Sequence, residues 1–124
     1  MGGELHNILT TIEIGPNIKA MVPREITNYY YSLIPKHFCP LRVGRPPHIT
    51  IVREFESVDT QKVNYLSGKE IVFSYSGADE IELVGPHFVI KAYSEEAQSI
   101  RIGLGLPPLR VGFNCFHFTI GYIE

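Results

Sequence analysis

The sequence predicts an α+β fold, and two observations lead to this. Two helical patterns fall at separate places among segments that read as antiparallel strands. The two halves of the chain also echo each other, because each brings a helix, then a basic loop containing proline, then a strand that begins His-x-Thr. We therefore expect residues 1–124 to form a single domain. It would have two pseudo-symmetric lobes of antiparallel strands flanked by helices, with a central cleft.

The first half holds two predicted strands and a helix. Asn7–Ile14 is rich in Ile and Thr and ends at a Gly-Pro pair, which is typical of a strand followed by a turn. Pro23 suits the first turn of a helix, and apolar and aromatic residues then recur at helical spacing over Arg24–Phe38. The basic, proline-rich segment Arg42–Pro47 separates this helix from a second strand, His48–Phe55.

The middle of the chain is rich in predicted strands. Thr60–Leu66 favours a short helix. Glu70–Ser76 and Glu80–Val84 then read as strands, and the alternating segment His87–Tyr93 follows as another.

The last quarter repeats the order of helix, loop and strand. Ser94 is a favourable N-cap for a helix that continues through Arg101 and stops near Gly103–Gly105. Leu109–Cys115 follows as a loop or short strand, and His117–Ile123 is the final strand.

Charge and targeting features narrow the class of protein. Eleven basic and thirteen acidic residues give a formal charge of −2, which disfavours a duplex nucleic-acid coat or a membrane-surface binder. No apolar run approaches the length of a membrane span, and Met1–Gly15 lacks the basic start of a signal peptide. Cys39 and Cys115 are expected to be reduced core thiols. We therefore expect a cytoplasmic protein.

The two His-x-Thr strands carry the candidate chemistry. Side chains alternate between the faces of a strand, so the His and Thr of each motif share one face while the apolar residues face the core. Each motif thus presents an imidazole and a hydroxyl roughly 6–7 Å apart. If a pseudo-two-fold axis relates the halves, the two motifs meet across one cleft. We call these four side chains the quartet: His48, Thr50, His117 and Thr119.

The quartet suits the cleavage of a phosphodiester. A neutral imidazole can take a proton from a water or ribose hydroxyl, and a protonated imidazole can give one to the leaving oxygen. The threonine hydroxyls can bind the non-bridging oxygens, where charge accumulates. Either histidine could be the acid or the base. We expect no cofactor and no metal site, because the chain has neither a CxxC nor an HExxH motif.

These residues resemble the twin motifs of the 2H phosphoesterase superfamily, which includes RNA 2′,3′-cyclic phosphodiesterases and cyclic nucleotide phosphodiesterases. The resemblance rests on His48–Thr50 and His117–Thr119, and extends more loosely through the repeated half-domain plan. It implies a metal-independent hydrolase with a 2H-like fold. In size and motif spacing the chain is similar to the compact phage enzymes that degrade cyclic oligonucleotide signals, the anti-CBASS phosphodiesterases. That likeness implies a cyclic oligonucleotide substrate and action in the host cytoplasm.

Residues around the quartet are candidates for substrate binding. Arg42 and Arg45 precede the first motif and Arg110 precedes the second, so they could clamp a phosphate; the alternative is solvated loop charge. Phe113 and Phe116 could line a base pocket, with core packing as the alternative.

Strand alternation also predicts which neighbours of the quartet face away from it. Arg53 and Tyr122 lie at odd spacing from the motif histidines and are expected on the opposite face, unless a bulge intervenes. Gly121 shares the face of the second motif and could leave room for a ligand, or be a glycine tolerated near a strand end.

Two other functions stay open beside cyclic oligonucleotide cleavage. One is an RNA 2′,3′-cyclic phosphodiesterase that acts in RNA repair or processing. The other is a non-catalytic sponge that binds a cyclic nucleotide without cleaving it, although the intact quartet favours an enzyme. A structural protein with coincidental motifs would have its two His-x-Thr faces far apart or buried.

Overall fold

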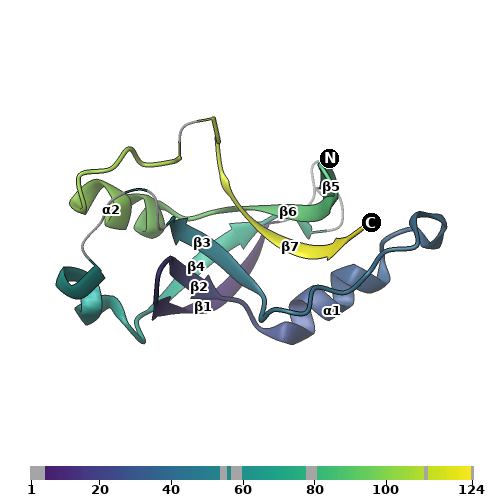
Figure 1. Ribbon diagram of the computed structural model, residues 1–124, viewed down its shortest axis with the longest axis horizontal. Coiled ribbons are helices and arrows are strands. Elements are labelled where there is room, and N and C mark those ends of the chain that lie inside the picture. The colour runs from purple at the N-terminus through teal and green to yellow at the C-terminus, as the bar shows by residue number, and fades with distance from the viewer. Residues whose placement is uncertain (1–4, 54–55, 57–59, 78–80, 111, 124) are drawn as a thin grey trace.

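The computed structural model describes residues 5–53, 56, 60–77, 81–110 and 112–123 (Figure 1). The strands are β1 (His6–Ile14), β2 (Ile18–Met21), β3 (His48–Val52), β4 (Glu70–Tyr75), β5 (Ile81–Val84), β6 (His87–Tyr93) and β7 (Phe116–Tyr122). The helices are α1 (Arg24–Ser32) and α2 (Glu95–Gly103), with 3₁₀ helices η1 (Lys36–Phe38) and η3 (Thr60–Leu66). The predicted α+β class is confirmed.

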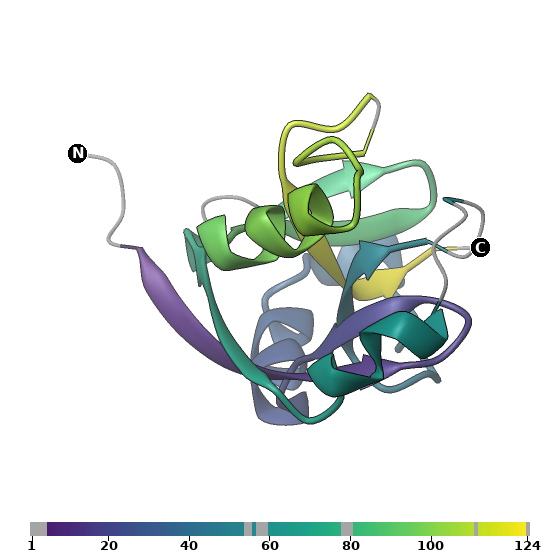
Figure 2. The same ribbon diagram turned by 90° about the vertical axis from the view of Figure 1, so that its left-hand side faces the viewer.

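The strands form one antiparallel sheet that closes on itself. Their order is β4-β1-β2-β3-β7-β6-β5, and the end of β4 also pairs with the end of β6, which completes a barrel. The helix α1 lies at one end of this barrel, while α2 and η3 lie at the other (Figure 1, Figure 2). Apolar residues from alternate strand positions fill the interior, including Ile8, Ile49, Phe73, Ile90 and Phe118, each at most 1% exposed.

The echo in the sequence has a counterpart in the topology. Each half contributes two paired strands, a helix and a third strand that pairs with the second: β1-β2-α1-β3 and β5-β6-α2-β7. The helices are exchanged between the halves, because α1 packs against β7 and α2 packs against β3 and β4. The final strands of the two halves, β3 and β7, are neighbours at the centre of the sheet.

Most predicted elements are present, and the differences have local causes. The predicted helix Arg24–Phe38 is wrong in length: α1 ends at Ser32, because Pro35 cannot donate its backbone hydrogen bond and disfavours helical geometry in the residue before it. The short strand β2 was not predicted. Thr60–Leu66 is a 3₁₀ helix, and the described part of Leu109–Cys115 forms no strand. Residues 54, 55 and 80, which the predicted strands included, lie outside the described residues.

Two further predictions concern the N-cap of α2 and the burial of the cysteines. Ser94 is extended, and its Oγ accepts a hydrogen bond from the Ala97 backbone N–H at 3.1 Å, which confirms the predicted cap. The core placement of the cysteines is wrong: Cys39 is exposed just after η1, and Cys115 is half-buried in the loop before β7. They form no disulfide. None of the described helices is long and apolar enough to cross a membrane.

Candidate active site

The pairing of β3 with β7 brings the two His-x-Thr motifs together. Ile49 lies opposite Phe118 across these strands, and both are fully buried in the core. One residue further along each strand, the same antiparallel register sets Thr50 opposite His117 and His48 opposite Thr119. All four residues of the quartet are half-buried on the outer face of the barrel. The two histidines are diagonal neighbours, which typically lie roughly 7–8 Å apart with their Cβ atoms somewhat closer, and this spacing leaves room for a phosphate.

A β-bulge interrupts each motif strand just after its threonine. In β3 the register with β2 skips Ile51, and in β7 the register with β6 skips Ile120. Two successive residues of each strand are therefore buried: Ile51 and Val52 in β3, and Ile120 and Gly121 in β7. Beyond each bulge the alternation of faces is reversed. The two halves thus share this irregularity as well as their strand order.

The bulges overturn the predicted orientations of Arg53 and Gly121. Arg53 lies on the same side as the quartet, where it lines a groove with His117 and Thr119. Gly121 leaves no room for a ligand, because it is buried and a Cβ at this position would come within 3.0 Å of Ile34 Cδ1. Its lack of a side chain admits the segment after α1. Tyr122, also expected opposite the quartet, follows the bulge and exchanges backbone hydrogen bonds with Leu41.

The ring of His48 is anchored by the backbone. Its Nδ1 lies 3.0 Å from the carbonyl oxygen of Pro46, and a carbonyl can only accept a hydrogen bond. The hydrogen on Nδ1 is therefore fixed by this partner, and Nε2 is the nitrogen that can exchange a proton. The proline-containing loop before β3 thus determines the tautomer of the first motif histidine.

The ring of His117 is held by packing and lies in a cationic environment. It stacks on Phe113, with ring centroids 6.0 Å apart and an angle of 16° between the planes. Burial lowers the pKa of His117 below its ordinary value of 6.5, and the charges of Arg53, Arg110, His48 and His87 lower it further. The neutral imidazole is therefore the favoured form of His117 near neutral pH.

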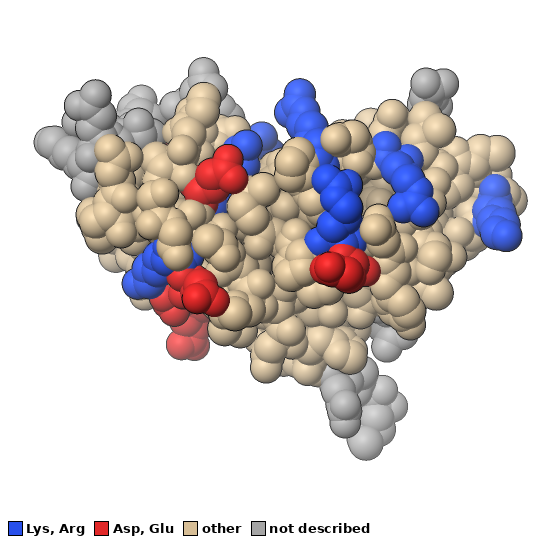
Figure 3. Space-filling model, turned by 90° about the horizontal axis from the view of Figure 1, so that it is seen from below, with Lys and Arg blue, Asp and Glu red and all other residues tan. Residues whose placement is uncertain are grey.

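A first hollow lies between α1 and the quartet, and we call it the α1-side hollow. Its lining includes Thr119, Arg42 and Arg45, so the structure places both predicted arginines beside the second motif. Arg42 donates a hydrogen bond to Asn28 Oδ1 at 3.0 Å, and its guanidinium lies 4.4 Å from the centroid of the Tyr31 ring. On the face shown in Figure 3, most of the visible basic side chains lie over the end of the molecule that carries α1.

A second hollow lies on the other side of Thr119, between the outer face of β5, β6 and β7 and the loop before β7. We call it the loop-side groove, and its volume is about 340 Å³, within the usual range for small-molecule sites. Arg110 and Phe113, both predicted to bind substrate, line it; the Arg110 guanidinium lies 4.6 Å from the centroid of the Phe113 ring. Phe116 packs in the core with its ring against Phe73, which is the core-packing alternative, and it also lines a small hollow with Thr50 and His117.

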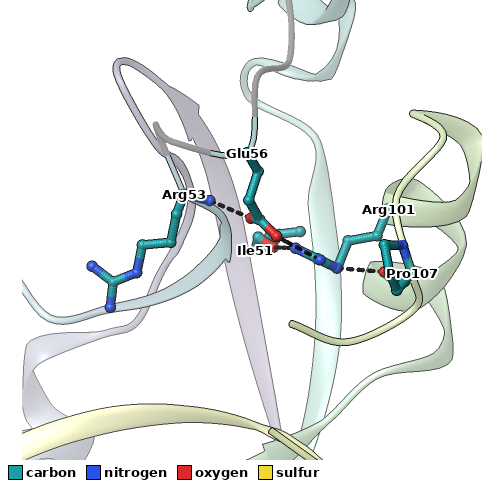
Figure 4. A network of polar contacts seen from close by, with 5 residues as sticks. All are labelled: Ile51, Arg53, Glu56, Arg101 and Pro107. Atoms are coloured by element: carbon teal, nitrogen blue, oxygen red, sulfur yellow. Dashed lines mark hydrogen bonds and ion pairs between the residues drawn. The ribbon is translucent and has the colours of Figure 1, made fainter. Parts of the chain in front are cut away.

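A buried ion pair supports the strand end that carries Arg53 (Figure 4). Arg101 on α2 is fully buried and donates hydrogen bonds to both carboxylate oxygens of Glu56, at 2.7 and 3.0 Å. The same guanidinium donates to the carbonyl oxygens of Ile51 and Pro107, each at 2.8 Å. Glu56 in turn accepts the backbone N–H of Arg53 at 2.7 Å. Burial raises the pKa of Glu56, but these hydrogen bonds outweigh burial and hold it below its ordinary value.

The arrangement provides two imidazoles, two hydroxyls and basic side chains on either side of them, which can together bind and protonate a phosphate ester. Among the residues that the structure describes, no group of three or more His, Cys, Asp or Glu side chains could hold a metal ion. Comparison with protein-family models, with curated proteins and with solved structures finds no match.

Proposed function

We propose that the protein is a metal-independent phosphodiesterase that cleaves a ribose phosphodiester with the quartet, and that its two repeated units act as the lobes of a 2H phosphoesterase-like domain. One observation carries this proposal: the register of β3 with β7 sets two His-x-Thr motifs side by side on one half-buried face. Two motifs that resembled each other only by coincidence would not be expected on neighbouring strands with their histidines and threonines on the same face.

We assign the base to His117 and the acid to His48. Near neutral pH the lowered pKa of His117 favours the neutral ring, which can accept a proton. The hydrogen bond to Pro46 occupies Nδ1 of His48, so the proton that this ring gives up is the one on Nε2. The hydroxyls of Thr50 and Thr119 donate to the non-bridging phosphate oxygens, where negative charge grows in the transition state.

For a 3′–5′ linkage the bonds and protons balance as follows. His117 takes the proton of the 2′-hydroxyl while its oxygen attacks phosphorus, and a bond forms between O2′ and phosphorus. The bond between phosphorus and O5′ breaks, and His48 protonates O5′. The product is a 2′,3′-cyclic phosphate, which water can open with the two roles reversed: His48, now neutral, takes a proton from the attacking water, and His117, now protonated, gives its proton to the ribose oxygen that leaves phosphorus. A cyclic oligonucleotide is the proposed substrate; an RNA 2′,3′-cyclic phosphate would require only the second step.

A turnover panel in EDTA tests the proposal. Its substrates are cyclic dinucleotides, cyclic trinucleotides, 2′,3′-cyclic AMP and 3′,5′-cyclic AMP. Loss of a general acid or base typically costs roughly 10²–10⁴ in rate, so His48→Ala and His117→Ala should each lower turnover by this factor while the circular dichroism spectrum is unchanged. His37→Ala is the matched control, because His37 lies on η1 and lines neither hollow.

Two results would contradict the proposal. Full activity of either His48→Ala or His117→Ala would exclude the acid–base mechanism. Binding of a labelled cyclic dinucleotide that is released unchanged after denaturation would identify the protein as a sponge.

A further inference from the structure

We infer that Arg53 and Arg110 form a second anion subsite in the loop-side groove, which binds a phosphate adjacent to the one that the quartet cleaves. This inference rests on the proposed phosphodiesterase function and narrows its substrate class. It predicts a preference for nucleotides with a second phosphate, such as a linear or cyclic oligonucleotide, over a nucleoside 2′,3′-cyclic monophosphate.

Arg53 faces the loop-side groove and carries a buried donor that lacks an acceptor within the described part of the chain. The bulge in β3 turns this residue to the side of the quartet, and it lines the loop-side groove together with His117 and Thr119. Its Nε is buried and has no hydrogen-bond partner among the described residues. Burying a charged donor without a partner is unfavourable, and an anion in the groove would supply the missing acceptor.

The backbone of Arg53 is held in place before any ligand arrives. Its backbone N–H donates to Glu56 Oε2 at 2.7 Å, and Glu56 is fixed by the fully buried Arg101. The side chain of Arg53 points away from both of these partners (Figure 4). The carboxylate therefore fixes the backbone without neutralising the guanidinium, which is the arrangement expected of a preorganised binding group.

Several basic side chains line the loop-side groove. Burial lowers the pKa of Arg110, and the charge of Arg53 lowers it further, which places the two guanidinium groups within electrostatic reach of each other. His87 and Lys91 also line this groove. The carboxylate of Glu82 lies 3.4 Å from Lys91 Nζ and offsets that one charge. Arg53 and Arg110 repel each other, although the carboxylate of Glu56 also acts favourably on Arg110, and a bound phosphate would relieve this repulsion.

The groove is also continuous with the reaction site. His117 and Thr119 line it, so a phosphate held by the quartet and one held by Arg53 would belong to the same substrate chain. Phe113 in the same lining exposes 44% of its surface, so the exposed part of its ring can contact the intervening nucleoside beside His117 and Arg110, which already lie against the ring. Arginine suits the second phosphate because its planar fork can donate two parallel hydrogen bonds.

Calorimetric binding of two product-like probes tests the subsite without requiring turnover. The probes are adenosine 2′-monophosphate and adenosine 2′,5′-bisphosphate, measured at one ionic strength. A charge-assisted contact predicts that the wild-type protein binds the bisphosphate roughly ten-fold or more tightly than the monophosphate. Arg53→Gln should abolish most of this difference, because it should lower the affinity for the bisphosphate much more than the affinity for the monophosphate. Arg53→Lys, which keeps the charge without the fork, should restore part of it.

The control variant is Lys36→Gln, which removes one exposed positive charge on η1 and should preserve the preference. Equal affinity of the wild-type protein for both probes would overturn the inference. So would an equal loss of both affinities in Arg53→Gln, or the same loss of preference in Lys36→Gln.

A kinetic arm separates this inference from the proposed function. The value of kcat/KM for 2′,3′-cyclic AMP should rise when a 5′-phosphate is added, and Arg53→Gln should bring the ratio of the two values close to one. The change that this variant makes to the pKa of His117 affects both substrates and cancels in the ratio. Turnover of both substrates at equal efficiency would reject the subsite and keep the phosphodiesterase. Selective bisphosphate binding without any turnover would keep the subsite and reject the phosphodiesterase.

Discussion

Removing the carboxylate of Glu56 should destabilise the protein more than any surface charge change. Arg101 is fully buried and its ion pair with Glu56 is 2.7 Å long, so Glu56→Ala leaves a buried cation with only backbone carbonyls as partners. Breaking one side of a buried ion pair typically costs about 3–5 kcal/mol. A domain has roughly 5–15 kcal/mol of unfolding free energy in total, so this variant should lose a large fraction of it.

Urea unfolding followed by circular dichroism measures the effect. With a slope of roughly 2 kcal/mol per molar urea, the midpoint should fall by about 2 M. The control is Glu96→Ala, because Glu96 pairs with Lys69 at 3.3 Å on the surface, where both side chains are 47% exposed. Such pairs contribute at most about 1 kcal/mol.

A double variant checks the explanation itself. Glu56→Leu combined with Arg101→Met removes both charges and keeps apolar volume, so it should recover most of the stability that Glu56→Ala loses. The reasoning would be refuted if Glu56→Ala and Glu96→Ala cost the same, or if the double variant were less stable than Glu56→Ala.

Three further outcomes follow from the site and its supports. An NMR titration should give His117 a pKa below 6.5, and Arg53→Gln should raise that pKa by removing a neighbouring positive charge; an unchanged value would contradict the electrostatic account. Because the pKa of Glu56 is lowered, its carboxylate contributes stability that is fully present above pH 4.5 and is lost as the pH falls below 4.5. The unfolding free energy of Glu56→Gln should therefore depend less on pH in this acid range. Gly121→Ala should cost about 1–3 kcal/mol in urea unfolding, because its Cβ would meet an isoleucine methyl at 3.0 Å. Gly103→Ala, which meets nothing within 4 Å, should cost nothing.

Local patterns in the sequence predict the parts of the fold that local physics decides. Alternating side chains identify most strands, and Ser94 marks the start of α2, because both depend on a few consecutive residues. The strand β2 escapes such reasoning because it has only four residues. Pro35 indicates that α1 ends before it. The residues around Pro35 continue the helical spacing, however, so the predicted helix extended to Phe38.

Local patterns likewise predict one part of the candidate site and fail to predict another. The shared face within each His-x-Thr motif follows from strand alternation, and the repeat suggests that the two motifs meet. The bulges depend on register with neighbouring strands, which no short segment encodes, so the sides of Arg53 and Gly121 were predicted wrongly. For Phe116 the sequence left core packing open as an alternative, and alternation from His117 places its ring on the core side.

The two repeated units have the same strand and helix order but differ in sequence. The surroundings of His48 and His117 can therefore differ, which they could not in a symmetric pair of identical units. In a dimer of identical units, any substitution that tunes one histidine would alter the other equally. Here a proline carbonyl anchors one ring, while a phenylalanine and two arginines surround the other. Acid–base catalysis needs its two partners in opposite protonation states at the same moment. A single chain that carries both units can specialise each partner for its own half of the proton exchange.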